Sequence, residues 1–158
     1  MKQSSKNLFL YKIQTTYDVA KIQEDIELIS ESLFSPKEKL EHILQTQVSY
    51  LTSELFQEIM KQEDILISDI DSIKSLMEEM LTLLKLCTVV ILEIAIPPTN
   101  DLISLIGNKI KEIGSYTMVL EIHTNQNLIG GATIAYKGKY KNYSIKPILT
   151  SILDNYHK

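Results

Sequence analysis

The sequence predicts an α+β protein, with an N-terminal helical bundle over residues 1–87 and a small α/β domain over residues 88–158. Apolar residues recur at helical spacing before Cys87, whereas short β-branched runs follow it. All five glycines lie after residue 100, and their absence earlier favours helices there, because glycine marks turns and close backbone approaches. Up to residue 96 the chain has 9 Lys against 16 acidic residues, a balance of −7, and the remainder has 7 against 4, a balance of +3.

About four amphipathic helices are expected in the first part. A weak apolar pattern over residues 5–15 is followed by a clear stripe over 19–33. Residues 35–38, Ser-Pro-Lys-Glu, have the form of an N-cap, a first-turn proline and a capping-box glutamate. One long helix is expected over 40–59, and residues 68–71 repeat the cap signature before a last helix. The stripe of that last helix consists of Ile70, Ile73, Met77, Met80, Leu81 and Leu84.

These stripes favour mutual packing in a small bundle. The near-heptad spacing over residues 40–59 also permits a second interpretation, in which one stripe receives a helix of a partner.

The second part changes to strand periodicity. Residues 89–96 are β-branched and apolar on both faces, which is typical of a central strand covered on both sides. Pro97 and Pro98 end this strand, Thr99 or Asn100 can cap the helix that follows, and Gly114 ends that helix. The expected order is strand, helix, strand, strand, strand, helix, with the helices at 100–113 and 145–155 and the later strands at 116–123, 129–136 and 140–143.

Composition excludes several function classes. The 16 basic residues are all Lys and the net charge is −4, so the chain has no bidentate arginine for phosphate, and nucleic acid is not an expected partner. The single Cys87 is expected to be a buried small apolar residue, and the three histidines are far apart in the sequence. No motif for a cofactor, metal or catalytic constellation is present, so neither an enzyme nor a cofactor is predicted.

No direct membrane insertion is expected either. The longest apolar run, residues 89–96, is interrupted by Glu93 and is less than half the length of a membrane span.

The pair Gly130 and Gly131 requires an explanation, because glycine weakens an apolar strand by roughly 0.5–1 kcal/mol relative to alanine. One reason is a bulge or an unusual backbone torsion after the turn. A second is a neighbouring backbone or helix that leaves no space for a side chain. A third, weaker reason is a phosphate cradle, although no Lys-Ser/Thr follows and the glycines lead into a strand.

A spaced pattern runs through the last part of the chain and consists of Leu128, Ile129, Gly130, Gly131, Gly138, Asn142 and Ser144. Through this pattern residues 88–154 resemble the C-terminal domain of the delta subunit of F-type ATP synthases, called OSCP in mitochondria. The signature of that family is a Leu-Ile-Gly-Gly run, a hairpin glycine and an Asp-x-Ser that opens the last helix. Two positions that are usually acidic are Asn125 and Asn142 here, and the helical part is short. The chain therefore resembles a divergent or shortened member of that family.

The resemblance implies a non-catalytic stator subunit that connects the catalytic head to the peripheral stalk. Its helical domain would receive the N-terminal helices of the alpha subunits, and its α/β domain would receive the C-terminal helix of subunit b. The resemblance also implies a bacterial protein at the cytoplasmic face of the plasma membrane, as a peripheral part of a membrane complex.

Lys137, Lys139 and Lys141 form a basic hairpin beside the glycine strand. They are interpreted either as lysines that protect a sheet edge from pairing or as a contact for an acidic stalk helix. Apolar residues at positions 129, 134, 145, 149 and 152 are expected to form the core and part of the stalk groove. The alternative function is a small ligand-sensing or regulatory α/β domain with a helical dimerisation half; an enzyme of unknown type is a third hypothesis.

Overall fold

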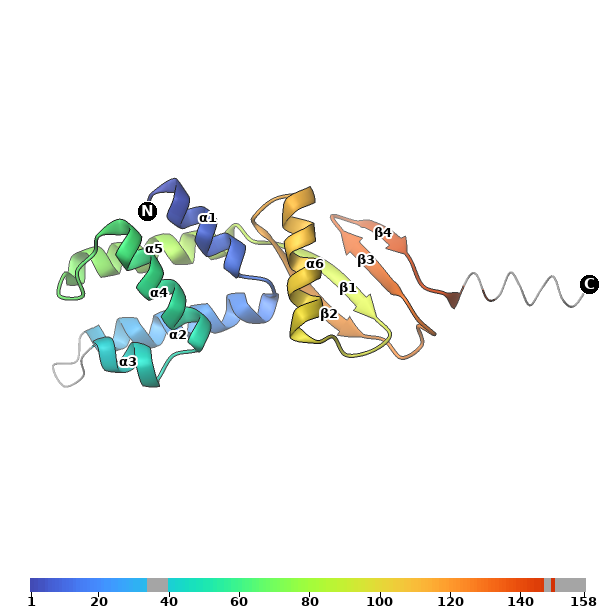
Figure 1. Cartoon of the computed structure of the whole chain (residues 1–158), viewed down its shortest axis with the longest axis horizontal. Coiled ribbons are helices and arrows are strands. Elements are labelled where there is room, and N and C mark those ends of the chain that lie inside the picture. Colours follow the sequence, from blue (N-terminus) through green and yellow to red (C-terminus); the bar gives the residue numbers. More distant parts are fainter. Residues whose placement is uncertain (34–39, 147–148, 150–158) are drawn as a thin grey trace, which may run out of the picture. The chain divides into compact units, whose positions relative to one another are not determined.

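The computed structural model describes residues 1–33, 40–146 and 149. Close contacts divide the chain into two compact units, Met1–Cys87 and Thr88–Lys158. The first unit is helical, and the second contains a β-sheet and a helix (Figure 1). The predicted α+β class is confirmed.

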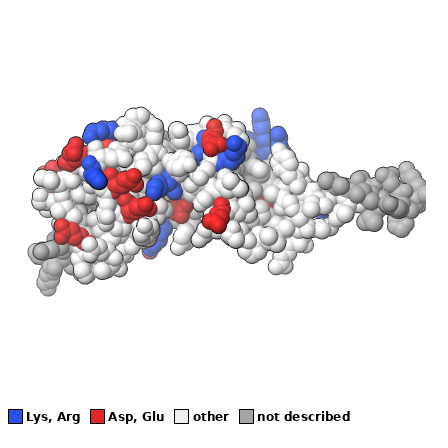
Figure 2. Space-filling view, in the orientation of Figure 1, with Lys and Arg blue, Asp and Glu red and all other residues white. Residues whose placement is uncertain are grey.

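The helical unit has an apolar core built from every helix described in it. Its helices are α1 (Gln3–Lys12), α2 (Thr16–Leu33), α3 (Leu40–Thr46), α4 (Tyr50–Glu63) and α5 (Ile70–Lys85). Its fully buried large side chains are Phe9, Ile13, Ile22, Ile26, Ile29, Ile43, Leu55, Phe56, Ile59, Ile73 and Met80. Acidic side chains and lysines are mixed over the outer surface, so no single-sign face dominates the visible side (Figure 2). The stripes thus pack against each other, as the bundle interpretation requires.

The expectation of one long helix over residues 40–59 is wrong, because the chain leaves the helical conformation between α3 and α4. Ser49 has extended torsions, φ −63° and ψ 152°, and its hydroxyl oxygen accepts the amide N–H of Thr52 at 3.3 Å. This is an N-cap, which starts a new helix. The apolar spacing continues through the break, so periodicity alone did not reveal it.

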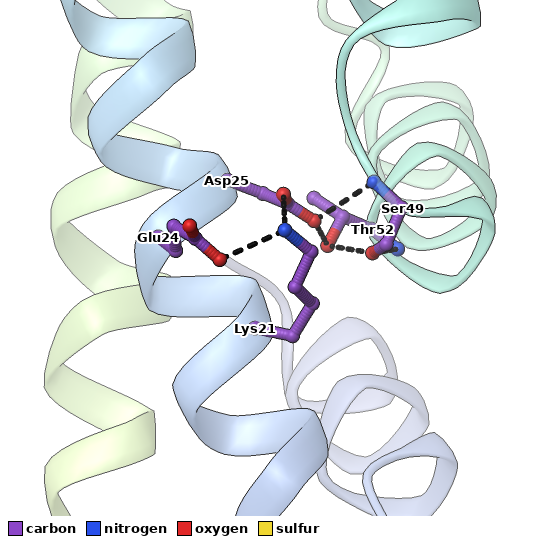
Figure 3. Close-up of polar contacts among 5 residues, drawn as sticks. All are labelled: Lys21, Glu24, Asp25, Ser49 and Thr52. Atoms are coloured by element: carbon purple, nitrogen blue, oxygen red, sulfur yellow. Dashed lines mark hydrogen bonds and ion pairs between the residues drawn. The ribbon is translucent and has the colours of Figure 1, made fainter.

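A buried carboxylate holds that break in place. Asp25 of α2 is 1% exposed and accepts two hydrogen bonds, from the amide N–H of Ser49 at 2.9 Å and from the hydroxyl of Thr52 at 2.7 Å (Figure 3). Its other oxygen lies 3.3 Å from the ammonium of Lys21, which also pairs with Glu24. Asp25 therefore joins the middle of α2 to the first turn of α4.

Burial by itself would raise the pKa of Asp25, but the hydrogen bonds from Ser49 and Thr52 and the contact with Lys21 outweigh it, and the pKa is lowered. Asp25 is therefore ionised in the folded protein at neutral pH. A buried carboxylate with one oxygen hydrogen-bonded and the other paired with an ammonium group is tolerated, whereas an unpaired one would be costly.

Two cap predictions have different outcomes. The cap expected at residues 35–38 lies outside the described residues. A cap before α5 is present, but it lies one residue later than the signature predicts: Asp69, and not Ser68, accepts the amide N–H of Ser72 at 3.1 Å and its hydroxyl at 2.7 Å. Ile70 was expected in the buried stripe but is 44% exposed, because it stands in the first turn; Leu76 is buried in the stripe instead.

The second unit is a four-stranded sheet with one described helix. Its elements are β1 (Thr88–Ile94), α6 (Asn100–Ile113), β2 (Met118–Thr124), β3 (Ala132–Tyr136) and β4 (Lys139–Asn142), and the strand order is β2-β1-β3-β4. β1 pairs in parallel with β2 and antiparallel with β3, and β3 pairs antiparallel with β4. The helix expected over 145–155 lies mostly outside the described residues.

One face of the sheet is covered by α6, which crosses β1 and β2 (Figure 1). Val90, Leu92 and Ile94 of β1 are buried on this face with Leu120 of β2. The opposite face differs from the prediction. β1 is central, but Val89 and Ile91 on its other face are each 39% exposed. Val119 and Thr133 on the same face are each 2% exposed, so that face is covered only in part.

Candidate partner-binding surface

The two signature glycines sit where the chain passes close to itself. Gly131 has φ +84°, and a Cβ atom there would clash with the carbonyl oxygen of Tyr143 and lie 2.9 Å from the Cα of Ser144. At Gly130 a Cβ atom would meet only the flexible end of Ile145, at 2.8 Å. The torsion and the close backbone approach both account for Gly131, whereas the crowding at Gly130 comes from a side chain that can move.

Backbone hydrogen bonds hold this close approach. The amide of Tyr143 donates to the carbonyl of Ala132 at 2.8 Å, and the amide of Ile145 donates to the carbonyl of Gly130 at 3.0 Å. These bonds continue the β3–β4 ladder beyond β4. The Leu-Ile-Gly-Gly run and the segment that follows β4 are therefore brought together.

The two asparagines act through their side-chain oxygens. Asn142 Oδ1 accepts the amide N–H of Ser144 at 2.8 Å, and Ser144 is buried. Asn125 Oδ1 accepts the amide N–H of Asn127 at 3.0 Å. Each asparagine thus closes a short turn by accepting the amide N–H of the residue two positions later. The carboxylate oxygen of an aspartate can accept the same bond.

The apolar residues expected around the signature divide into buried and exposed sets. Ile134 packs against the sheet core, and Leu128 is half-buried. Ile129 is 64% exposed, so its assignment to the core is wrong. Ile145 and Leu149 are also exposed, and Ile152 lies outside the described residues.

The lysine hairpin is solvated. Lys137 adopts φ +47° in the turn with Gly138, and its ammonium lies 5.3 Å from the centroid of the Tyr136 ring. Lys139 and Lys141 are exposed on the edge strand β4, directly opposite Tyr136 and Ile134. Since opposite residues share a face of the sheet, these two lysines lie on the face that carries α6.

The face away from α6 is organised in rows across the strands, and we call it the open face. One row contains Glu121, Ile91, Ala135 and Tyr140, and the next contains His123, Glu93, Thr133 and Asn142. Val89 lies on the same face one row earlier, beside Val119. Along β1 the open face therefore changes from apolar at Val89 and Ile91 to polar at Glu93.

Polar contacts surround the second of these rows and reach Glu121 in the first. Glu93 Oε2 accepts a hydrogen bond from the hydroxyl of Thr133 at 3.1 Å and another from the side-chain nitrogen Nδ2 of Asn125 at 3.4 Å. Glu121 Oε1 lies 3.0 Å from His123 Nε2. No functional role was predicted for Glu93, Glu121 or Thr133. The alternation along β1 was the available signal, but residues 89–96 were interpreted as buried on both faces.

The described residues hold no group of three or more His, Cys, Asp or Glu side chains arranged to bind a metal ion. Among the helices of the described part, none is long and apolar enough to cross a bilayer. Compared with known proteins, the chain matches no family model, and no curated protein is significantly similar to it.

Proposed function

We propose that the chain is a stator subunit of an F-type ATP synthase that connects the catalytic head to the membrane-anchored stalk. It is non-catalytic, and it works at the cytoplasmic face of the bacterial plasma membrane without entering the bilayer. The proposal rests on the signature resemblance in residues 88–154 and on the geometry at that signature.

The observation that carries the proposal is the approach of Gly131 to Tyr143 and Ser144. Two motifs that are 12 residues apart, Gly130-Gly131 and Asn142-x-Ser144, meet through backbone hydrogen bonds. The backbone of Tyr143 and Ser144 accounts for the glycine at position 131, and the turn closed by Asn142 includes the amide of Ser144. The pairing gives a physical reason for finding them at this spacing.

The asparagines that replace acidic residues are compatible with the proposal. Asn142 and Asn125 use their side-chain oxygens as acceptors for amide groups two residues on. An aspartate oxygen accepts the same bond. The replacement therefore removes a charge and keeps the turn.

Each unit has a proposed partner. The helical unit would bind the N-terminal helices of the head's alpha subunits, and the sheet unit would bind the C-terminal helix of subunit b. Helix docking on apolar surfaces needs no catalytic group and no cofactor. Two surfaces of the sheet unit are candidates for the b helix: the hairpin with Lys137, Lys139 and Lys141, and the open face.

The alternative function, a ligand-sensing domain that holds an anion at the glycine pair, has less support. The backbone of Tyr143 and Ser144 already occupies the space beside Gly131. An anion bound there would have to displace it. Thermal stabilisation of the chain by a small anionic metabolite would nevertheless revive that alternative.

A truncated chain tests the proposal. Removal of residues 124–158 deletes β3, β4 and the whole signature, and it should abolish binding to the C-terminal segment of the cognate b subunit. The helical unit should keep its helical circular dichroism and its melting transition, because it is a compact unit with an apolar core of its own. Undiminished affinity of the truncated chain for the stalk segment would show that the assignment is wrong.

A further inference from the structure

One edge of the sheet is formed by β4, which in the described part of the chain has a neighbouring strand on one side only. All four of its residues are exposed, and Tyr140 is 61% exposed. An exposed strand edge presents amide N–H and carbonyl groups in a row, which another extended chain can pair with. β4 is therefore a place where a further strand can join the sheet.

The hydrogen bonds to β3 decide which residues of β4 present their backbone outward. The amide of Tyr143 donates a 2.8 Å hydrogen bond to the carbonyl of the first residue of β3. In an antiparallel pair, residues that bond to the neighbouring strand alternate with residues whose N–H and C=O point away from it. Lys139 and Lys141 thus bond to β3 as Tyr143 does, whereas Tyr140 and Asn142 present their amides and carbonyls outward.

The side chains that flank these outward groups are basic. Lys139 and Lys141 stand on either side of Tyr140, and both are exposed. The sequence has no Asp or Glu between Glu121 and Asp154, so neighbours along the chain do not offset this charge. A strand that joins the sheet at β4 therefore meets two positive charges at alternate positions.

A second copy of the chain fits this edge poorly. If Tyr140 paired with Tyr140 of another copy, Lys139 would stand opposite Lys141, and if Tyr140 paired with Asn142, Lys141 would stand opposite Lys141. Like charges directly opposite each other on paired strands are destabilising. The two lysines thus disfavour self-pairing and favour a strand of the opposite charge.

We propose that β4 pairs antiparallel with an extended acidic segment of a partner protein, in which two Asp or Glu residues flank an apolar residue. The apolar residue lies opposite Tyr140 and exchanges two backbone hydrogen bonds with it. The two carboxylates stand opposite Lys139 and Lys141. This partner is additional to the helices of the stator proposal, and the inference does not depend on them.

The strand geometry favours this alternation of residue types. Positions of an antiparallel pair that exchange no hydrogen bonds bring the Cα atoms to about 4.5 Å, against about 5.5 Å at the bonded positions. Lys139 and Lys141 occupy the closer positions, so carboxylates opposite them can reach their ammonium groups. A helix could not use the outward groups of Tyr140 and Asn142 in this way, because its own amides and carbonyls are bonded internally.

The experiment measures binding of the full chain to the acetylated and amidated peptide Thr-Glu-Val-Glu-Thr by NMR titration. We expect the backbone amides of Tyr140 and Asn142 to shift and to become protected from hydrogen exchange in the complex. The control peptide Thr-Glu-Pro-Glu-Thr has the same charge but no central amide N–H, and it should bind about tenfold more weakly. Equal binding of the two peptides would show charge attraction without strand pairing and would overturn the inference.

The lysines are tested by charge reversal. The double variant Lys139→Glu/Lys141→Glu should bind the acidic peptide about tenfold more weakly, and it should bind Thr-Lys-Val-Lys-Thr better than the wild type does. Lys137→Glu is the control, because this residue lies in the turn beyond β4, and it should alter affinity less than about twofold. The melting transition reports folding, and Lys139→Gln/Lys141→Gln serves if the double glutamate variant does not fold.

The remaining outcomes would each overturn the inference. Protection of the Tyr140 and Asn142 amides before peptide is added would show that residues 147–158 or a second copy already cover this edge, and sedimentation distinguishes the two. No response of these amides to excess peptide would show that β4 accepts no strand. Equal losses in Lys137→Glu and in the double variant would mean that the position of the charge is irrelevant. None of these results affects the stator proposal, whose test uses the b subunit.

Discussion

The hydroxyl of Thr52 donates a 2.7 Å hydrogen bond to the carboxylate of Asp25, which is buried and belongs to a different helix. The bond explains why the apolar pattern over residues 40–59 is divided between two helices. Asp25 accepts hydrogen bonds from the start of α4, and these bonds in return stabilise the buried charge of Asp25 inside the bundle.

Replacement of Asp25 by Asn should lower the free energy of unfolding by about 1–3 kcal/mol. The amide oxygen can still accept from Ser49 and Thr52, but Lys21 loses its buried partner. Denaturant unfolding followed by circular dichroism measures the change. Glu24→Gln is the control, because Glu24 pairs with the same lysine at the surface, and it should cost less than about 0.5 kcal/mol. Equal effects of the two variants would mean that Asp25 contributes no more than a surface ion pair.

The contribution of Asp25 should depend on pH in one direction. Its pKa is lowered in the folded protein, so the unfolded chain takes up the proton first as the pH falls. The stability that the ionised group provides is therefore complete above the ordinary carboxyl pKa of about 3.9 and is lost below it. The difference in unfolding free energy between wild type and Asp25→Asn should be constant from neutral pH to about pH 5 and should then shrink. A difference that grew on acidification would contradict the assigned direction of the shift.

Two glycines with positive φ provide a matched pair. Gly131 has φ +84° and a crowded Cβ position, whereas Gly138 has φ +75° and open space around it. Gly138→Ala should cost about 1–2 kcal/mol, the usual penalty of the left-handed region for a residue with a side chain. Gly131→Ala pays the same penalty and must also move the backbone at Tyr143, so we expect roughly 3 kcal/mol or more. Thermal unfolding of the sheet unit measures the destabilisation of both variants. If the two were equally destabilised, the close approach of Tyr143 would not be the reason for a glycine at position 131.

The turn at Asn142 should tolerate aspartate but not alanine. Asn142→Ala removes the acceptor for the amide of the buried Ser144 and should destabilise the sheet unit by about 1 kcal/mol. Asn142→Asp keeps an acceptor oxygen at the same place and should be close to neutral. The test compares the melting temperatures of the two variants. If aspartate destabilised the sheet unit as much as alanine does, Asn142 would not take the place of an acidic residue in this turn.

Much of the fold was predictable because local signals agreed with the tertiary structure. The apolar stripe of α2, the Thr99 cap of α6 and the change of period at Thr88 each correspond to a described element. The parallel pairing of β1 with β2 follows from the helix between them.

The predictions that were wrong share one physical cause: the burial of a side chain depends on neighbours that are distant in the sequence. The carboxylate of Asp25 is buried only because Ser49 and Thr52 approach it from 24 and 27 residues away. Ile91 is exposed because α6 covers the other face of β1, and a β-branched run looks the same whether one face or both are packed. The glycine signature was recognisable, but the choice among a torsion, a close backbone and a phosphate required the position of Tyr143.

The most direct test of the central claim is affinity purification of the tagged full-length chain from its own cells in mild detergent. The account predicts that the alpha subunit of the catalytic head and the b subunit of the stalk are recovered together with the chain. Recovery of a folded wild-type chain with neither the head nor the stalk would contradict the claim that this protein couples the two.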